Sequence, residues 1–385
     1  MLGTVLLVGS AIFSYLLNLN LFRHARKRAE ADTGGPNVIR WASTTKPTVG
    51  GISFFVTFVL AVVAFFLAYG IPTREAGSNF LALIIVTTLG FFIGLQDDTY
   101  NTRPLLKFLG QVTCAVIMIM YDLHISVFDI PALNYFFTVF WVVGIMNSVN
   151  LLDNMDAVTG TVSLIIVVVT IMRLMVFPSD VGDNAFLFVL VACAGAFIGF
   201  LIHNWHPSRI YMGDTGSQFL GAFLAFIGIH FFWNFDWGIN GSSQPWITRM
   251  IVPVMVFIVP IMDTTFVTVG RLMRGQSPFV GGKDHLTHNM SYLGVPQHLV
   301  PVALGLVSLT SGALAIFGLR YFLQTSALNT FAFVGYLGIL ALIFFFIYKR
   351  GERIGVAKQR FSKTFQRAYL ERQNGPVQAQ EKQHS

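Results

Sequence analysis

The sequence predicts an all-α integral membrane protein, a polytopic bundle of about 11 transmembrane helices with its N-terminus outside and its C-terminus in the cytoplasm. Two observations predict this class. Of the 385 residues, 54% are hydrophobic and only 11% are charged, with a mean hydropathy of +0.66; a soluble domain carries roughly 25% charged residues. Apolar stretches also recur along the whole chain, and about 20 such residues span a bilayer as a helix.

The apolar stretches give the expected spans in order, with 106–121 and 132–147 rather short. The first span is followed by the basic run "RHARKR", the reverse of the order in a secretory signal, so it is expected to be permanent. The spans are 3–21, 50–69, 79–95, 106–121, 132–147, 160–177, 185–202, 217–233, 248–270, 297–318 and 327–348.

The distribution of basic residues predicts the orientation. With the N-terminus outside, the inside segments before the tail hold eleven Lys and Arg residues, whereas the outside segments hold Arg74 and Arg320, with Arg249 at a boundary. Retained cytoplasmic loops are rich in Lys and Arg. The net charge of +7 is therefore attributed to these loops and to anionic lipid head groups, not to nucleic acid. The expected parts are a transmembrane domain at 1–348 and a basic, partly disordered cytoplasmic tail at 349–385.

Four polar segments fall on the cytoplasmic side: 96–107, 147–159, 203–217 and 271–296. Asp97 and Asp98 directly follow an apolar run, and two carboxylates at a helix C-terminus oppose the helix dipole. Lys107, Arg103 or a metal could compensate. Gathered carboxylates repel one another unless a cation joins them, and oxygen ligands favour a hard ion such as Mg²⁺. The alternative for any single Asp here is an ordinary helix cap.

The other polar motifs also have two interpretations each. In "MGDTGSQ", glycines flank Asp214 before an apolar helix, whose N-terminus suits a phosphate or a carboxylate. In "NSVNLLDNMD", polar residues at a spacing of three form either a ligand-facing strip or a polar seam between helices. "DHLTHN" suits phosphate binding or proton donation better than zinc. Asp263 lies inside a span with Pro253 and Pro260, so it is expected to face the bundle and pair with a partner, in a bent helix.

Together, Asp97-Asp98, "NSVNLLDNMD", "IYMGDTGS" and the histidine-containing fourth loop resemble the polyprenyl-phosphate N-acetylhexosamine-1-phosphate transferases, glycosyltransferase family 4. The resemblance runs from about Lys46 to Gly294. It implies that a UDP-activated amino sugar gives its sugar 1-phosphate to undecaprenyl phosphate, with release of UMP and with Mg²⁺ (Mn²⁺ as the alternative) as cofactor. It further implies a multi-pass protein of the bacterial inner membrane with a cytoplasmic active site that starts a cell-envelope polysaccharide. A homodimer is expected from the family alone.

The resemblance also implies roles for single residues. Asp214 would bind the metal, with Asn150 as the second protein contact, and Asp97 would activate or position the lipid phosphate with Asp98 assisting. The other catalytic candidates are Asp153, His285 and His288. The substrate-binding candidates are Lys107 near the phosphates, Asn204, Tyr211 and Asp156 at the uracil, and Asn147, Asp263 and Lys283.

Departures from the family pattern affect the choice of donor. Asn154 and Ala157 stand where the family has glycine, and Asn154 is expected to keep a left-handed turn. "HLTHN" and "PIMDT" resemble the enzymes that start O-antigen and teichoic-acid linkage synthesis, whereas "KPTVGG" resembles phospho-MurNAc-pentapeptide translocase. UDP-GlcNAc is the expected donor, with the translocase reaction as the alternative. Two further classes stay open: a transporter, indicated only by Asp263 in its proline-containing span, and a lipid-binding scaffold, which leaves Asp97 and Asp98 unexplained.

Overall fold

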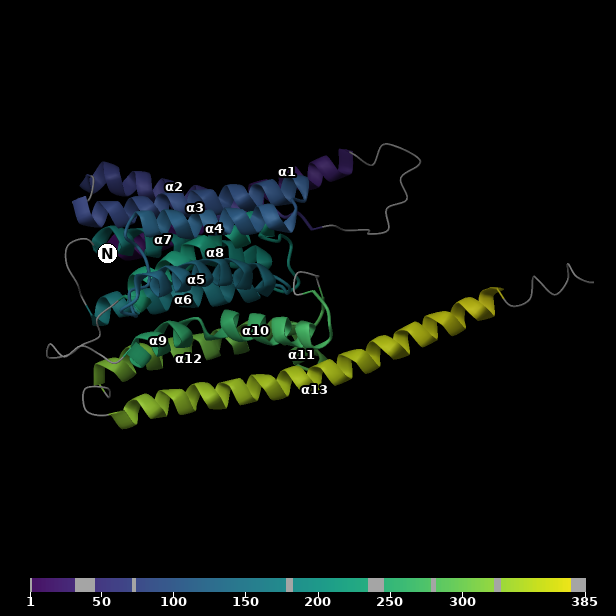
Figure 1. Ribbon diagram of the computed structural model, residues 1–385. Coiled ribbons are helices and arrows are strands. Elements are labelled where there is room, and N and C mark those ends of the chain that lie inside the picture. Colours follow the sequence, from purple (N-terminus) through teal and green to yellow (C-terminus); the bar gives the residue numbers. More distant parts are fainter. Residues whose placement is uncertain are drawn as a thin grey trace, which may run out of the picture.

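The computed structural model describes residues 2–31, 46–70, 74–177, 183–234, 246–277, 282–321 and 327–374, and within these ranges all regular structure is helical (Figure 1). The elements are α1 (Leu2–Ala31), α2 (Gly50–Tyr69), α3 (Arg74–Tyr100), α4 (Pro104–Met120), α5 (Pro131–Leu152), α6 (Val158–Val176), α7 (Asp183–Asn204), α8 (Gly213–Ile227), the π-helix η1 (Gly228–Trp233), α9 (Trp246–Val256), α10 (Ile258–Met273), α11 (Leu286–Tyr292), the 3-10 turn η2 (Gln297–Leu299), α12 (Val300–Tyr321) and α13 (Ala327–Asn374).

The helices confirm a polytopic, all-helical membrane protein. Among the described residues, nine helices are long and apolar enough to cross a membrane, or ten if the bent pair α9–α10 counts as one span. α4 is a shorter apolar helix of 17 residues. A helix therefore stands at the place of every expected span, while the count of eleven and the orientation stay predictions.

The span that contains the two prolines is broken, as the sequence predicts. α9 and α10 meet at Phe257 with a bend of 84°. Pro260 lies in the first turn of α10 and has no N–H to donate to the carbonyl of Val256. The helix therefore stops at Val256 and restarts at Ile258, and α10 carries Asp263 in a new direction.

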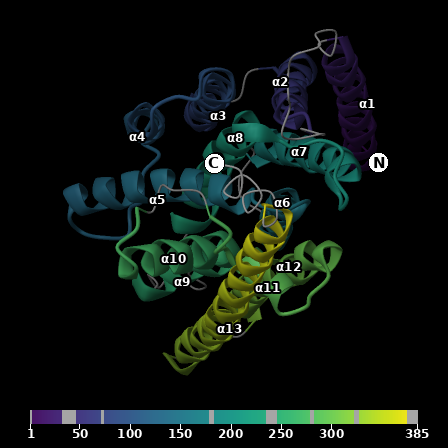
Figure 2. The same cartoon turned by 90° about the vertical axis from the view of Figure 1, so that its right-hand side faces the viewer.

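α8 lies in the middle of the bundle. Viewed down the bundle, α1 to α4 lie on one side of α8, and α9 to α13 lie on the other side, beyond α5 and α6 (Figure 2). Every residue from Thr215 to Ile227 is buried. At Gly94 of α3, an added Cβ would collide with the carbonyl of Asp214. Because only glycine allows this approach, α3 brings Asp97 and Asp98 directly against the start of α8.

α13 is one continuous helix that runs past the other helices at the end where the polar loops lie (Figure 1). It crosses the expected boundary at 348 without a break and continues to Asn374; residues 375–385 lie outside the described part. Beyond the bundle it packs on α11, where Gly351 and Gly355 leave no room for a Cβ beside Asn289 and Tyr292. α11, which follows His285, is thus supported from behind by α13.

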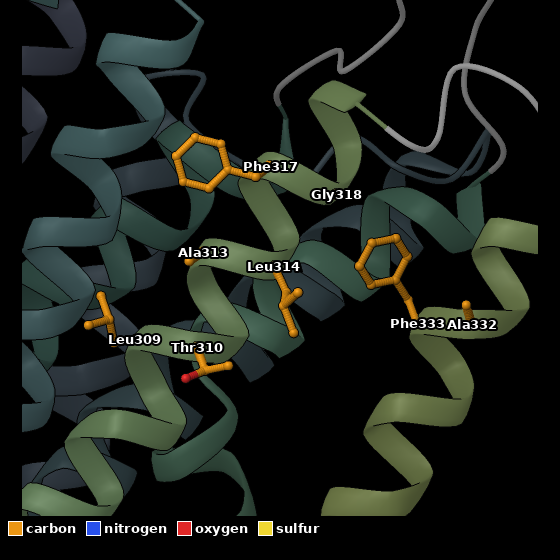
Figure 3. A pocket seen from close by; sticks show the side chains of 8 residues that line it. All are labelled: Leu309, Thr310, Ala313, Leu314, Phe317, Gly318, Ala332 and Phe333. Atoms are coloured by element: carbon orange, nitrogen blue, oxygen red, sulfur yellow. The ribbon is translucent and has the colours of Figure 1, made fainter.

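An apolar cleft of about 580 Å³ separates α12 from α13 near their connection (Figure 3). Thr310 is its one side chain with a polar group; the others that line it are Leu309, Ala313, Leu314, Phe317, Gly318, Ala332 and Phe333. The cleft lies at the start of α13, whereas α11 packs against the middle of that helix. Its lining suits lipid chains, and the polar chemistry of the molecule lies at the other end.

Candidate active site

Lys107 joins two carboxylates at the polar end of the bundle. Its Nζ donates to Asp97 Oδ2 at 2.7 Å and lies 3.3 Å from Asp214 Oδ1. Asp97 Oδ1 accepts from the backbone N–H and the hydroxyl of Thr102, at 2.9 and 2.7 Å. Asp97 comes from the last turn of α3, Lys107 from the first turn of α4 and Asp214 from the first turn of α8. Lys107 is therefore the compensating cation that the sequence analysis considered for the acidic pair.

Asp98 has a different set of partners from its neighbour. Its Oδ1 accepts from the backbone N–H of Asp214 at 3.0 Å, and its Oδ2 accepts from the N–H and the hydroxyl of Thr215 at 2.8 and 2.6 Å. These are first-turn donors of α8, where the helix dipole favours a negative charge. The anion-binding N-terminus expected at "MGDTGSQ" thus exists, and the anion that it holds is Asp98. The helix begins at Gly213, before the expected start at Ser217.

Asn150, near the end of α5, contacts α8 at the same level. Its amide nitrogen donates to Asp214 Oδ1 and, at 2.8 Å, to Ser217 Oγ. As a metal ligand, Asn150 would present its carbonyl oxygen after a half-turn of the amide. Among the described residues, no three His, Cys, Asp or Glu side chains are placed to hold a metal ion. The donor set nevertheless fits Mg²⁺, which is commonly held by one or two carboxylates together with substrate phosphates and water.

The turn between α5 and α6 carries Asp153 and Asp156. Burial and the nearby charge of Asp214 raise the pKa of Asp153 to about 7. Burial acts in the same direction on Asp156, but its pKa is lowered by hydrogen bonds from the backbone N–H and the hydroxyl of Ser208 and from His206. The two acids therefore differ in protonation: Asp153 can exchange a proton near neutral pH, while Asp156 stays ionised.

The prediction that Asn154 adopts the left-handed conformation in this turn is wrong. Asn154 keeps a negative φ, and Ala157 has the left-handed conformation instead, with φ of 64°. The helix α6 starts directly after Ala157, so the chain must reverse there. Asn154 has another contact: its Oδ1 accepts from the hydroxyl of Thr287 at 2.5 Å, which joins this turn to the fourth loop.

The residues expected at the uracil form a connected group. Lys46 donates to Ser208 Oγ at 2.9 Å, and its Nζ lies 5.0 Å from the centre of the Tyr211 ring. Asn204 is 3% exposed; its Oδ1 accepts from the N–H of Ala157 and its amide donates to the carbonyl of Ile210. Asn204 therefore ties the acidic turn to the segment that carries Tyr211. Tyr211 is partly exposed.

The fourth loop is attached to the broken span through Asp263. This carboxylate is fully buried and accepts from the N–H of Leu286 at 2.7 Å, and His285 Nδ1 lies 2.8 Å from it. The expected partner of Asp263 is thus confirmed and is His285. His288 lies one turn further along the chain, and burial lowers its pKa to about 4, so it is neutral at physiological pH.

The same loop is held on its outer side by ion pairs. Asp284 accepts from Arg271 at 2.7 Å and from Arg274 at 2.8 Å, and Arg274 also contacts Glu352 of α13. Burial tends to raise the pKa of Asp284, but the bonds to Arg271 lower it overall. Lys283 is exposed at the edge of the cavity between α10, α11 and α13.

The structure brings most candidates to one end of the bundle. They form an acidic group and a second group in the fourth loop, where His285 meets Asp263. Asp97, Lys107, Asn150 and Asp214 meet directly, and Asp153 is close enough to feel the charges of Asp98 and Asp214. Asn147 lies deeper and bonds to Gln111. The sequence analysis missed Thr102, Thr215, His206 and Ser208. All four stand inside the polar segments 96–107 and 203–217, so reading these segments for hydroxyl and imidazole partners could have found them.

Comparisons with known proteins agree with this geometry. The model of the family "Glycosyl transferase family 4" matches residues 80–232, which run from within α3 to within η1 and contain the acidic group. A probable undecaprenyl-phosphate N-acetylglucosaminyl 1-phosphate transferase of Bacillus subtilis is 28% identical over 273 residues, covering 68% of this chain and 70% of that protein. A decaprenyl-phosphate N-acetylglucosaminephosphotransferase of Mycobacterium tuberculosis is 29% identical over 272 residues, covering 65% and 67%.

A phospho-N-acetylmuramoyl-pentapeptide-transferase of Streptococcus sanguinis is 30% identical over 234 residues, covering less of this chain, 56%. The fold and the acidic site thus define a multi-pass membrane protein of the glycosyl transferase class. Within that class, the chain belongs to the polyprenyl-phosphate N-acetylhexosamine-1-phosphate transferase superfamily, on the side of the N-acetylglucosamine-1-phosphate transferases.

Proposed function

We propose that the protein transfers N-acetylglucosamine 1-phosphate from UDP-GlcNAc to undecaprenyl phosphate, releases UMP and so starts a cell-envelope polysaccharide. The observation that carries the proposal is that Lys107 joins Asp97 and Asp214 at the polar end of an apolar bundle. A lysine between two carboxylates can exchange one carboxylate for a phosphate oxygen with little movement. The N-acetylglucosamine relatives cover more of the chain than the pentapeptide transferases do, which supports this donor.

The reaction exchanges one phosphorus–oxygen bond for another. An oxygen of the lipid phosphate bonds to the β-phosphorus of the donor, while the bond from that phosphorus to the bridging oxygen breaks and UMP leaves with that oxygen. The lipid phosphate is largely ionised at neutral pH, so Asp97 need not remove a proton. Held by Lys107 and Thr102, Asp97 instead orders the place where the two substrates meet.

The residues around this place have separate tasks. Asp98 fixes the first turn of α8 and with it the position of Asp214. Lys107 offers a positive charge to the diphosphate, and the partly exposed ring of Tyr211 suits stacking with uracil. Mg²⁺ held by Asp214 with Asn150 would supply charge neutralisation on the diphosphate as the bond to UMP breaks. Neutral His288 can donate a hydrogen bond to the sugar or the diphosphate.

A donor panel tests the proposal. Purified protein with undecaprenyl phosphate and Mg²⁺ is offered UDP-GlcNAc, UDP-GalNAc, UDP-MurNAc-pentapeptide or a UDP-diamino sugar, and UMP is measured. We expect release with UDP-GlcNAc. Release with UDP-MurNAc-pentapeptide alone would assign the translocase reaction instead. No UMP from any donor, with solute flux in liposomes, would favour a transporter and contradict the proposal.

Asp214 provides the matched test of the site. Asp214→Ala should abolish UMP release while the protein stays folded, because it removes one end of the lysine bridge and the proposed metal ligand. Asp122→Asn is the control, since the Asp122 side chain is 96% exposed at the opposite end of the bundle and should have no effect. Activity that survives Asp214→Ala would refute the metal assignment.

A further inference from the structure

A second polar layer lies one helical turn deeper in the bundle than the acidic group. Gln111 follows Lys107 by four residues on α4, Asn147 precedes Asn150 by three on α5, and Gln218 follows Asp214 by four on α8. Residues three or four apart lie on the same face of a helix. The three helices α4, α5 and α8, which supply Lys107, Asn150 and Asp214 to the upper layer, therefore each supply an amide to the lower one. Gln111 and Gln218 are both 0% exposed.

The three amides form one directed network. Asn147 Nδ2 donates to Gln111 Oε1 at 2.8 Å, and Gln111 Nε2 lies 3.3 Å from Asn147 Oδ1 and donates to Gln218 Oε1 at 3.1 Å. Asn147 Nδ2 also donates to the carbonyl of Val143, an acceptor that cannot be reversed. That bond fixes the orientation of the Asn147 amide. Because Asn147 donates to Gln111 and Gln111 donates to Gln218, it also fixes the orientations of these two amides. Gln218 Nε2 has no hydrogen-bond partner in the described part of the chain.

α4 depends on this network for its place in the bundle. It is the short apolar helix at the edge, beside α3 (Figure 2). Its buried residues are Gln111, Cys114, Ala115 and Met118, so Gln111 is the single buried residue of α4 with a hydrogen-bonding amide. Leu105, Leu106, Phe108 and Leu109 are exposed. Apolar contacts are non-directional, whereas hydrogen bonds to two neighbouring helices define both the depth and the rotation of α4.

Lys107 lies on α4 one turn before Gln111, while its partner Asp214 lies on α8 one turn before Gln218. The distance from Lys107 to Asp214 is therefore set by how α4 is aligned with α8. The Gln111–Gln218 bond holds that alignment at the nearest buried turn. The bond between Gln111 and Asn147 aligns α5, which carries Asn150, with the same two helices.

We propose that Gln111 is a positioning residue that acts through Lys107: the amide layer aligns α4 with α5 and α8 so that the ammonium group can reach Asp97 and Asp214 together. The inference rests on the proposed transferase reaction for its activity readout. It also makes a claim about donor binding that needs no turnover. Asn147, which was expected to bind the substrate, is under this proposal a member of the supporting amide layer.

A double-mutant cycle tests the proposal. Gln111→Met keeps the length of the side chain and removes its hydrogen bonds. We expect it to lower kcat for UMP release and the affinity for UDP-GlcNAc, measured by equilibrium dialysis, by about tenfold to a hundredfold, the effect of a misplacement of roughly 1 Å. In a Lys107→Met background the same change should have almost no further effect, because the residue that it positions is gone.

The controls separate the outcomes. Thr113→Val alters an exposed residue of α4 that bonds only within its own helix and should match the parent protein. Gln218→Met breaks the same link from α8 and serves if Gln111→Met is poorly folded. Equal losses in the parent and Lys107→Met backgrounds would overturn the proposal. A parent protein that neither binds UDP-GlcNAc nor releases UMP would instead refute the proposed function.

Discussion

Replacing Asp98 by Ala tests whether Asp98 stabilises the start of α8, as its hydrogen bonds indicate, and takes no part in the chemistry. The change removes three hydrogen bonds at the start of α8, two from backbone N–H groups and one from the Thr215 hydroxyl. Loss of a helix cap costs about 0.5–2 kcal/mol. Asp98 is solvent-exposed, so we expect a loss of about 1–2 kcal/mol and not the full sum of three charge-assisted bonds. The unfolding temperature should fall by a few degrees.

The assay is thermal unfolding in detergent, measured with UMP release on the same samples. Asp98→Asn keeps one acceptor oxygen and should fall between Ala and the parent in both readouts. Thr215→Val removes only the 2.6 Å hydroxyl bond and should have a smaller effect. If Asp98→Ala abolishes turnover while the unfolding temperature is unchanged, Asp98 takes part in the chemistry and the capping role is refuted.

Four further predictions follow from local geometry. Because the pKa of Asp153 is raised from 3.8 to about 7 by burial and by Asp214, the folded state favours the protonated carboxyl and stability falls as pH rises through this window; Asp153→Asn should therefore raise the unfolding temperature in EDTA at pH 8 but not near pH 4. Gly94→Ala places a Cβ against the carbonyl of Asp214 and should reduce UMP release, while Gly144→Ala, with open space around it, should not. Ala157→Gly removes a left-handed strain of about 1–2 kcal/mol, offset by about 0.5–1 kcal/mol of glycine entropy, so the unfolding temperature should stay level or rise slightly. A reporter fused to the C-terminus should read cytoplasmic, and a periplasmic signal would refute the predicted orientation.

Much of the fold could be predicted from the sequence because the membrane restricts the choices. A segment of about 20 apolar residues in lipid has to be a helix, so each expected span has a helix at its place. The bend at Phe257 was predictable from Pro253 and Pro260 for a similar reason, since each proline lacks an N–H. The helix ends were less predictable. α8 begins at Gly213 and α13 continues to Asn374, because polar residues can extend a helix past the apolar part of the chain.

The location of the candidate site was predictable from the sequence, but the pairing of its side chains was not. The sequence indicated which loops meet at one end and that Asp263 needs a partner. Which histidine Asp263 meets could not be read from the sequence, because His285 and His288 both lie far along the chain from it and only the folded loop brings one of them against the carboxylate. The lower amide layer could have been found, since Gln111 and Gln218 follow Lys107 and Asp214 at the spacing of one helical turn.

The acidic pair shows most clearly how a helix end changes an interpretation. If α3 stopped before Asp97, both carboxylates would lie in a loop and could turn toward one ligand. α3 continues to Tyr100, and successive residues on a helix point about 100° apart. Two adjacent carboxylates on a helix cannot face the same point, so each must have its own partner: Lys107 for Asp97 and the start of α8 for Asp98. The pair thus consists of one carboxylate that Lys107 holds in the candidate site and one that holds the first turn of α8 in place.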